Sequence, residues 1–192
     1  MSTVDDRPDL SLGEFLPVTE SAAIASGRWL GRGDNNSADQ AAVDAMRREF
    51  SKLNISGRVV IGEGEKDKAP QLYNGEEVGA GGMAVDIGVD PLEGTDLVSR
   101  GDEGAIAICV IAERGGILSA PDMYMRKLCV GATAKGKVDI TAPIADTMAA
   151  VAESYGRDVQ DITAIVLDRP RHEQLIAEIR ETGARIRLIP DG

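Results

Sequence analysis

The last part of the chain constrains its fold most strongly, because it reads strand, helix, strand. Residues 163–167 and 184–189 are rich in aliphatic side chains, and residues 171–181 between them have helical periodicity ended by Gly183. Two strands joined by one helix pair in parallel, and two strands alone cannot bury both of their faces. We therefore expect the 192 residues to be the N-terminal portion of a longer protein, or a short chain whose sheet a partner covers.

The composition favours an α/β fold for the rest of the chain as well. Aromatic residues make up 3% of the sequence, so the core must rest on valine, isoleucine, leucine and alanine between turns that the 22 glycines form. Periodicity predicts helices and strands in turn, with Ser37 and Gln40 as a capping box for the second helix. The predicted helices are 18–30, 37–53 and 143–155, and the predicted strands are 58–61, 83–90, 105–112, 117–120 and 125–130.

Strand 105–112 is expected to be buried on both faces and to form a hairpin with 117–120. The expected organisation is a loose tail over residues 1–15, a metal-binding domain over 16–157, and an incomplete α/β domain over 158–192.

Charge and cysteine content exclude several classes of partner. The chain has 32 acidic and 21 basic residues, a net charge of −11, which repels nucleic acids and anionic membranes. The polar N-terminus has no leader pattern, and the longest apolar run, 105–112, is too short to cross a bilayer. Cys109 and Cys129 lack the spacing of a disulfide framework or zinc cage, so the cytoplasm fits best.

Acidic residues gather in three separate segments that offer hard oxygen ligands. They are Asp39, then Glu63, Glu65 and Asp67, and then Asp90 and Glu93. Such carboxylates repel one another unless they stay exposed or a cation such as Mg²⁺ or Mn²⁺ holds them together. Taken singly, each has a simpler explanation as a solvated loop charge, a first-turn acid or a turn residue.

The segment 90–95 combines features suited to phosphate chemistry. Pro91 is expected to end the strand that delivers Asp90, Gly94 allows close backbone approach, and Thr95 adds a hydroxyl. In a phosphate-ester hydrolase, divalent ions would lower the pKa of a bound water, and a carboxylate with a threonine would aim it at phosphorus.

Several motifs together resemble class II fructose-1,6-bisphosphatase, of the lithium-sensitive, metal-dependent phosphatase superfamily. They occur in that family's order from about residue 18 to the end of the chain. The motifs are Trp29-Leu-Gly-Arg-Gly-Asp34, Ala38-Asp39, Val60-Ile-Gly-Glu-Gly-Glu65, Ala84-Val-Asp-Ile87, Asp90-Pro-Leu-Glu-Gly-Thr95, Ala120-Pro-Asp-Met-Tyr-Met125 and Arg169-Pro-Arg-His172.

The resemblance implies a layered α-β-α-β-α sandwich and hydrolysis of the 1-phosphate of fructose 1,6-bisphosphate to fructose 6-phosphate in gluconeogenesis, by a metal-activated water with Mg²⁺ or Mn²⁺. The metal ligands it implies are Asp39, Glu63, Asp90 and Glu93. The resemblance also implies that Asp67 and Thr95 are catalytic residues. The substrate contacts it implies are Glu93, Gly94, Thr95, Tyr124, Arg169, Pro170, Arg171, Asp191 and Gly192.

The residues themselves support part of this assignment. Arg169 and Arg171 flank a proline and offer planar forks suited to the phosphate that is not cleaved, although they could also be solvated helix-start charges. Tyr124 could equally be a core aromatic residue. His172 is the only histidine, and we expect a supporting or structural role for it.

Two departures from the family pattern keep other functions open. Asn35 stands where family members commonly carry lysine, and the family's further metal-binding glutamate lies beyond residue 192. The alternatives are a phosphatase for sedoheptulose 1,7-bisphosphate or inositol phosphate, and a non-catalytic metal- or anion-binding fragment that pairs through its sheet. A homo-oligomer is possible.

Overall fold

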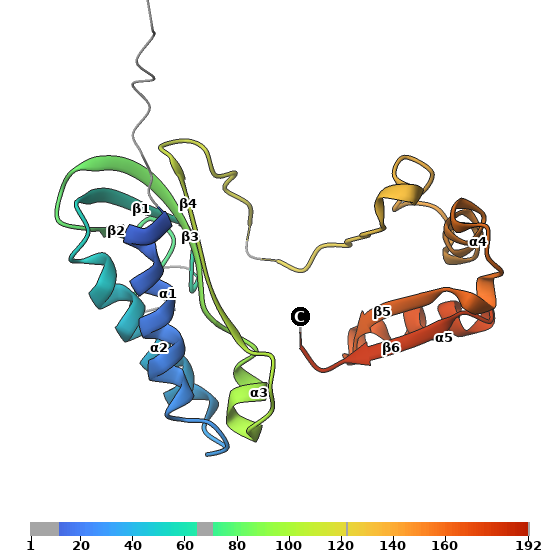
Figure 1. Cartoon of the computed structure of the whole chain (residues 1–192), viewed down its shortest axis with the longest axis horizontal. Helices are drawn as coiled ribbons and strands as arrows, with labels where there is room; N and C mark the ends of the chain where they lie inside the picture. The colour runs from blue at the N-terminus through green and yellow to red at the C-terminus, as the bar shows by residue number, and fades with distance from the viewer. Residues whose placement is uncertain (1–11, 65–70, 122, 192) are drawn as a thin grey trace, which may run out of the picture. The chain divides into compact units, whose positions relative to one another are not determined.

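The computed structural model describes residues 12–64, 71–121 and 123–191 (Figure 1). The chain forms two compact units, residues 1–122 and residues 123–192, which we describe separately. Within the described ranges, no helix has the length and apolar character needed to cross a membrane.

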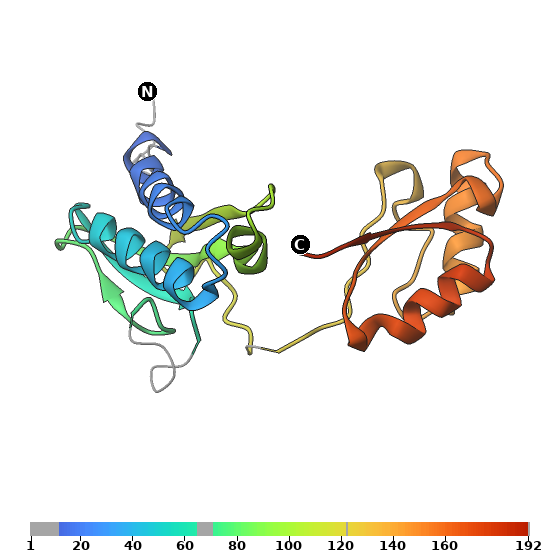
Figure 2. The same cartoon turned by 90° about the horizontal axis from the view of Figure 1, so that it is seen from below.

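Unit 1 is a sheet with helices on one face. Its helices are α1 (Leu12–Gly27), α2 (Asn35–Phe50) and α3 (Thr95–Arg100), and its strands are β1 (Ile55–Ile61), β2 (Glu77–Val78), β3 (Met83–Glu93) and β4 (Ile106–Glu113). Among the described residues the sheet has the strand order β2-β1-β3-β4, with β1 and β3 parallel and the outer pairs antiparallel. Helices α1 and α2 lie side by side over it (Figures 1 and 2).

The core of unit 1 fills the space between α2 and the sheet. Met46 and Phe50 of α2 are fully buried and pack with Val59 of β1 and Ile87 of β3. This core is mainly aliphatic, with Phe50 as its one fully buried aromatic residue among the described residues, as the composition predicts.

Apolar and acidic side chains alternate along strand β3, so they point to opposite faces of the sheet. Val85, Ile87 and Val89 belong to the core, so the alternation of a strand directs Asp86 and Asp90 to the opposite face. The prediction that Pro91 ends this strand was wrong. The strand continues to Glu93, and the ladder to β4 changes register between Asp90 and Glu93, which accommodates a proline that cannot donate a hydrogen bond.

Three further local predictions were wrong. Residues 117–120 and 125–130, all of them described, form no strand, because β4 finds its antiparallel partner in β3 instead of in a hairpin. Strand β4 is half-buried on average, with Val110 51% exposed on the face away from the helices. Helix α2 is capped by Asp34, whose carboxylate accepts the Ser37 N–H, so Ser37 does not begin a capping box.

Unit 2 contains the parallel strand–helix–strand motif that the sequence predicts. Its regular elements are the 3₁₀ turns η1 (Ala132–Ala134), η2 (Val159–Asp161) and η3 (Pro170–His172), the helices α4 (Ile144–Tyr155) and α5 (Glu173–Glu181), and the strands β5 (Thr163–Leu167) and β6 (Arg185–Ile189). Strands β5 and β6 pair in parallel, and the mixture of helices and sheets in both units confirms the expected class.

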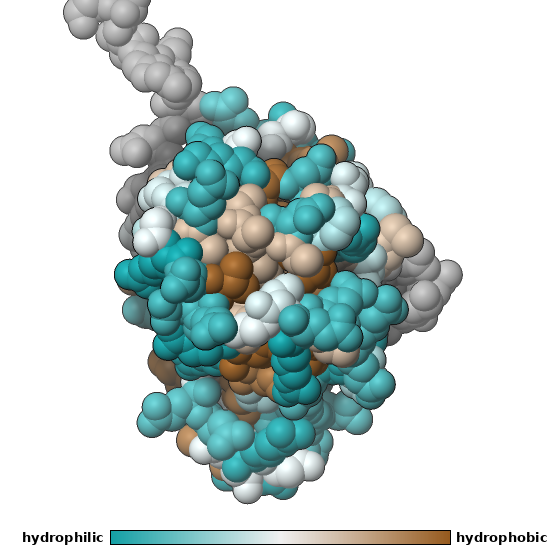
Figure 3. All heavy atoms as spheres, turned by 90° about the vertical axis from the view of Figure 1, so that its right-hand side faces the viewer, coloured by the Kyte–Doolittle hydropathy of each residue, from teal (hydrophilic) through white to brown (hydrophobic). Residues whose placement is uncertain are grey.

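Helix α4 belongs to the core of unit 2. Met148 and Ala152 of this helix are buried, and Met148 packs with Val166 of β5 and Ile176 of α5. The units therefore divide at 122/123, whereas the sequence places a domain boundary at 157/158. Some apolar surface stays open to solvent (Figure 3), and in unit 2 the side chain of Ile165 is 63% exposed.

Candidate metal and phosphate sites

Three of the predicted ligands come from three different elements of unit 1. Asp39 lies in the second turn of α2, Glu63 follows the end of β1 by two residues, and Asp90 lies near the end of β3. Because β1 and β3 are parallel neighbours, their carboxyl ends lie at the same edge of the sheet. All three side chains are half-buried.

The electrostatics of these three carboxylates show that they act on one another. Burial raises the pKa of Glu63, and the charges of Asp39 and Asp90 raise it further, to about 7. Burial also raises the pKa of Asp39. Three carboxylates in one field, partly shielded from water, are an arrangement that a divalent cation would relieve.

The side chains do not stand in a finished coordination shell. Among the described residues, no three carboxylates, thiols or imidazoles form a group that could hold an ion as they stand. Glu93 lies at the last position of β3, three residues after Asp90. Asp67, like Glu65, lies outside the described residues.

The turn after Asp90 is closed by hydrogen bonds to both backbone groups of Leu92. One Asp90 carboxylate oxygen accepts the Leu92 N–H at 3.2 Å, and the Thr95 hydroxyl donates to the Leu92 carbonyl at 3.2 Å. Gly94 has φ +92°, the left-handed conformation that glycine favours, and α3 begins directly after it. A Cβ on Gly94 would meet Ala105 Cα at 3.2 Å, so the chain approaches closely here.

The loop before α2 joins the two helices that carry Asp39 and Thr95. The Gly31 and Gly33 N–H groups donate to the carbonyls of Val98 and Ser99 in α3, at 2.8 and 2.9 Å. The Asn35 amide, at the start of α2, donates to an Asp96 carboxylate oxygen in α3 at 2.6 Å. The glycine-rich motif therefore holds α2 and α3 together.

A second backbone contact holds the loop that carries Glu63. The Glu63 N–H donates to the Leu72 carbonyl at 3.0 Å, and the Gly62 N–H donates to the Asn74 side chain at 2.8 Å. A Cβ on Gly62 would lie 2.0 Å from the Leu72 carbonyl oxygen, so only glycine fits at this position. The Gly-Glu-Gly motif thus places Glu63 through its backbone.

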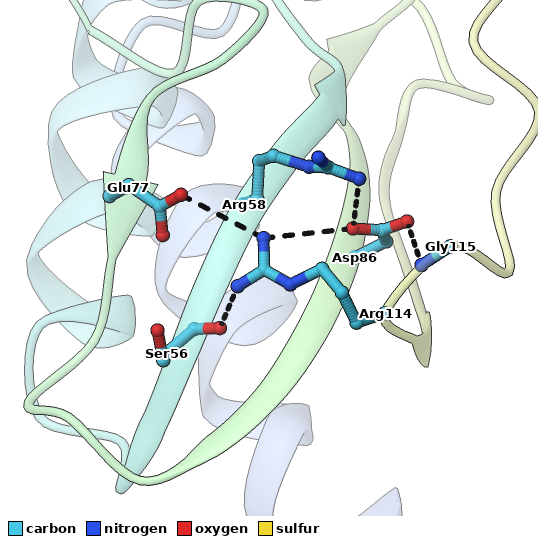
Figure 4. Close-up of polar contacts among 6 residues, drawn as sticks. All are labelled: Ser56, Arg58, Glu77, Asp86, Arg114 and Gly115. Atoms are coloured by element: carbon cyan, nitrogen blue, oxygen red, sulfur yellow. Dashed lines mark hydrogen bonds and ion pairs between the residues drawn. The ribbon is translucent and has the colours of Figure 1, made fainter.

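Asp86 is a buried charge whose role sequence reasoning missed (Figure 4). Its carboxylate pairs with Arg58 at 2.9 Å and with Arg114 at 3.8 Å, and it accepts the Gly115 N–H at 2.6 Å. Burial alone would raise the pKa of Asp86, but the bond from Gly115 and the two guanidinium groups lower it below its usual value. The sequence does contain a signal for this ion pair: Asp86 lies on the same face of β3 as Asp90, and Arg58 stands opposite it on β1.

The residues predicted to bind the uncleaved phosphate and the sugar lie in unit 2, where Arg169 and Arg171 follow β5 and Asp191 follows β6. Arg169 lies 3.7 Å from Asp191, and the Arg171 guanidinium lies over the Tyr124 ring, 4.1 Å from its centroid. Tyr124 is 83% exposed, so the alternative that it is a core residue was wrong. Pro170 begins η3 between the two arginines, and Gly192 lies outside the described residues.

Comparison with known proteins is consistent with this set of motifs. A family model described as bacterial fructose-1,6-bisphosphatase, glpX-encoded, matches residues 9–192. Fructose-1,6-bisphosphatase 1 class 2 of Escherichia coli (strain K12) is 52% identical over 187 residues, which are 97% of this chain and 55% of the E. coli protein.

Cyanobacterial proteins match to a similar extent. D-fructose 1,6-bisphosphatase class 2/sedoheptulose 1,7-bisphosphatase of Trichodesmium erythraeum (strain IMS101) is 50% identical over 192 residues, 93% of this chain and 56% of that protein. The protein of the same name from Synechocystis sp. (strain ATCC 27184 / PCC 6803 / Kazusa) is 46% identical over 96% of this chain and 57% of its own length.

The chain thus spans somewhat more than half the length of these curated relatives. The family model covers nearly all of it, and each relative is close to half identical to it over almost the whole chain. By both measures, the chain belongs to the family of bacterial, glpX-encoded fructose-1,6-bisphosphatases.

Proposed function

We propose that this chain is the metal-binding and phosphate-binding N-terminal part of an enzyme that hydrolyses the 1-phosphate of fructose 1,6-bisphosphate. The single observation that supports this most is the electrostatic coupling of Glu63 to Asp39 and Asp90, which come from three different elements. The name of the E. coli relative, fructose-1,6-bisphosphatase 1 class 2, indicates the substrate.

The donor set fits Mg²⁺ or Mn²⁺. Asp39, Glu63, Asp90 and Glu93 would hold the cation, and carboxylate oxygens are the ligands that these ions prefer. When bound, a divalent ion supplies Lewis acidity and lowers the pKa of water. With a pKa of about 7, Glu63 would have to give up its proton to serve as a ligand.

The side chains of the turn would orient the attacking water. The Thr95 hydroxyl donates its hydrogen to Leu92, which leaves its lone pairs to accept a hydrogen from a water molecule. Asp67 would be the acid needed for turnover, and Glu93, Gly94 and Thr95 would contact the phosphate to be cleaved. Direct attack by water needs no phosphorylated side chain.

The groups of unit 2 would hold the other phosphate and the sugar. The forks of Arg169 and Arg171 suit a phosphate dianion, and Tyr124 would contact it beside Arg171. Asp191 would accept hydrogen bonds from sugar hydroxyls, with the backbone of Pro170 and Gly192 completing the contacts.

Phosphate release tests the proposal. The protein expressed from its full reading frame should release phosphate from fructose 1,6-bisphosphate with Mn²⁺ or Mg²⁺, and Asp90→Ala and Glu93→Ala should remove this activity while leaving the fold intact. No release from this substrate would reject the proposal.

Arg171→Ala should raise KM more than it lowers kcat, because the uncleaved phosphate is held alike in the ground state and the transition state.

A second substrate is favoured by the cyanobacterial relatives, whose name includes sedoheptulose 1,7-bisphosphatase. Sedoheptulose 1,7-bisphosphate presents the same two phosphates on a sugar one carbon longer. Comparing kcat/KM for the two substrates on the same preparation decides between single and dual specificity.

We also propose that the enzyme is located in the cytoplasm. Cys109 and Cys129, the only cysteines of the chain, are both free thiols, which supports a reducing cytoplasm. Sedimentation would establish whether the protein forms a homo-oligomer.

A further inference from the structure

The only histidine of the chain lies between the two predicted phosphate-binding arginines and α5. His172 is the last residue of the 3₁₀ turn η3 and the residue before α5 begins. Its imidazole Nδ1 lies 2.9 Å from the carbonyl oxygen of Leu167, the last residue of β5. The side chain therefore connects the beginning of the helix to the end of the strand.

The chemistry of this contact fixes where the proton is. A carbonyl oxygen can only accept a hydrogen bond, so Nδ1 must carry the hydrogen. In its neutral form the ring is then the Nδ1–H tautomer, with a lone pair on Nε2. This tautomer can be measured, and it gives the contact a spectroscopic signature of its own.

Backbone hydrogen bonds fold the segment between these two points into a tight turn. The Arg169 N–H donates to the same Leu167 carbonyl at 3.0 Å, and the His172 N–H donates to the Arg169 carbonyl at 2.8 Å. The Asp168 N–H donates to Ile189 of β6 at 2.8 Å. The His172 imidazole adds a side-chain hydrogen bond to these backbone bonds, between the last residue of the turn and Leu167 at its start.

Both arginines of the turn have defined partners within unit 2. Arg171, next to His172, lies over the Tyr124 ring, and Arg169 lies 3.7 Å from Asp191. Tyr124 and Arg171 are both exposed, so their contact alone leaves the guanidinium weakly held. The backbone of the turn must then supply most of the constraint on Arg171.

We propose that His172 is a positioning residue, whose Nδ1–H bond to Leu167 holds the turn so that Arg171 stays over Tyr124 and binds phosphate. The phosphate ligand rests on the proposed function, whereas the effect on the turn does not. Loss of the hydrogen bond should loosen Arg171 without disturbing α5 or the β5–β6 pair.

Two substitutions separate the hydrogen bond from the bulk of the ring. In His172→Asn the side-chain amide nitrogen stands at nearly the same place as Nδ1, whereas in His172→Gln it lies one carbon further along. Gln174→Ala is the matched control, because Gln174 lies in the first turn of α5, two residues after His172, and its side chain bonds Glu178 instead of the turn. The Asn variant should therefore behave like the wild type and the Gln variant should not.

Nuclear magnetic resonance of the 192-residue chain gives the readout. In the wild type, ¹⁵N shifts of the single imidazole should report the Nδ1–H tautomer, and the side-chain N–H of Arg171 should be shifted upfield by the Tyr124 ring. The upfield shift should persist in His172→Asn and Gln174→Ala and disappear in His172→Gln. The Nε2–H tautomer in the wild type, an unchanged shift in His172→Gln or its loss in His172→Asn would each overturn the proposal.

Calorimetry with inorganic phosphate and with fructose 6-phosphate tests the ligand separately. The His172→Gln variant should bind fructose 6-phosphate about fivefold to tenfold more weakly than the wild type, the loss expected from one hydrogen bond. If the wild type binds neither ligand while the Arg171 signal responds as expected, the phosphate-binding function fails and the positioning role stands. Equal affinities in wild type and His172→Gln would overturn the role of His172 in binding.

Discussion

Glu63 has its pKa raised first by burial and then by the charges of Asp39 and Asp90. Its pKa of about 7 means that it stays protonated in the folded chain at pH values where an unfolded glutamate, near 4.5, is ionised. The folded state therefore binds more protons between these two values. The contribution of Glu63 to the stability of the metal-free chain therefore falls as the pH rises from about 4.5 to about 7, and then levels off.

We expect Glu63→Gln to stabilise the metal-free chain above pH 7 and to have little effect near pH 4. The amide copies the protonated side chain and removes the cost of ionising it. After discounting for the solvent that reaches a half-buried group, the melting temperature at pH 8 should rise by roughly 2–4 °C. Thermal unfolding at both pH values checks this.

Glu103→Gln is the control for that measurement, because Glu103 is an exposed glutamate of the same unit. It should leave the pH dependence unchanged. A Glu63→Gln variant that is less stable than the wild type at pH 8 would contradict the coupling among the three carboxylates.

Asp86 is expected to be the most sensitive charged residue of the sheet. Asp86→Ala would leave the Arg58 and Arg114 guanidinium groups facing each other and the Gly115 N–H without its acceptor. We expect the melting temperature to fall by roughly 10 °C. Arg58→Ala should cost less, because the Arg58 side chain is 43% exposed and Arg114 would remain beside Asp86. Equal, small effects in calorimetry would contradict this account.

Among the elements, α3 depends on the glycine that precedes it. Gly94 has φ +92°, and a Cβ there would meet Ala105 at 3.2 Å, whereas Gly75 has φ +94° with no atom within 4 Å of such a Cβ. Gly75→Ala should therefore cost only the conformational strain, about 1–2 kcal/mol. Gly94→Ala should cost about 1–3 kcal/mol more, because the chain must also move away from Ala105. Urea unfolding compares the two variants, and equal losses would show that Gly94 is not crowded.

The sequence predicted the elements whose pattern is local. The unit-2 strands and the helix between them, and α2, follow from side-chain period and glycine stops. The pairing of β4 with β3 across α3 could not be predicted, because it depends on contacts distant in sequence, and glycine pairs such as Gly115–Gly116 suggest a hairpin equally well. Pro91 within a strand required knowledge of the register shift beside it.

The candidate site shows the same limit. The acids could be found because their types and motif spacing are visible in the sequence. That Asp39 and Asp90 both act on Glu63 could not be derived from the residues alone, since it depends on how α2 packs against β3 and on the pairing of β1 with β3. The contact between Arg171 and Tyr124 joins residues far apart in the sequence in the same way.

At the scale of the whole molecule, the two units should respond differently to metal. The only tryptophan, Trp29, packs against the core of unit 1, so its fluorescence reports the unfolding of that unit. At an Mn²⁺ concentration one hundred times Kd, unit 1 should gain about 2.7 kcal/mol, which raises its melting temperature by roughly 5–10 °C. The melting of unit 2, followed through the His172 resonances, should not change.

Asp90→Asn is the control for the metal effect, because it removes one predicted ligand and retains the shape of the side chain. It should abolish most of the Mn²⁺-dependent rise in the Trp29 signal. An equal rise in both units, or in the variant, would place the cation somewhere other than among the three carboxylates.

The alternation along β3 has a consequence for how this protein can change over evolution. Odd-numbered positions such as Val85 and Ile87 serve the core, and even-numbered positions carry Asp86 and Asp90. Inserting or deleting a single residue early in this strand would exchange the two sets, sending carboxylates into the apolar interior and valines to the opposite, polar face. Substitutions can accumulate in β3 one at a time, but its length has to stay constant, so related sequences should align through residues 83–90 without a gap.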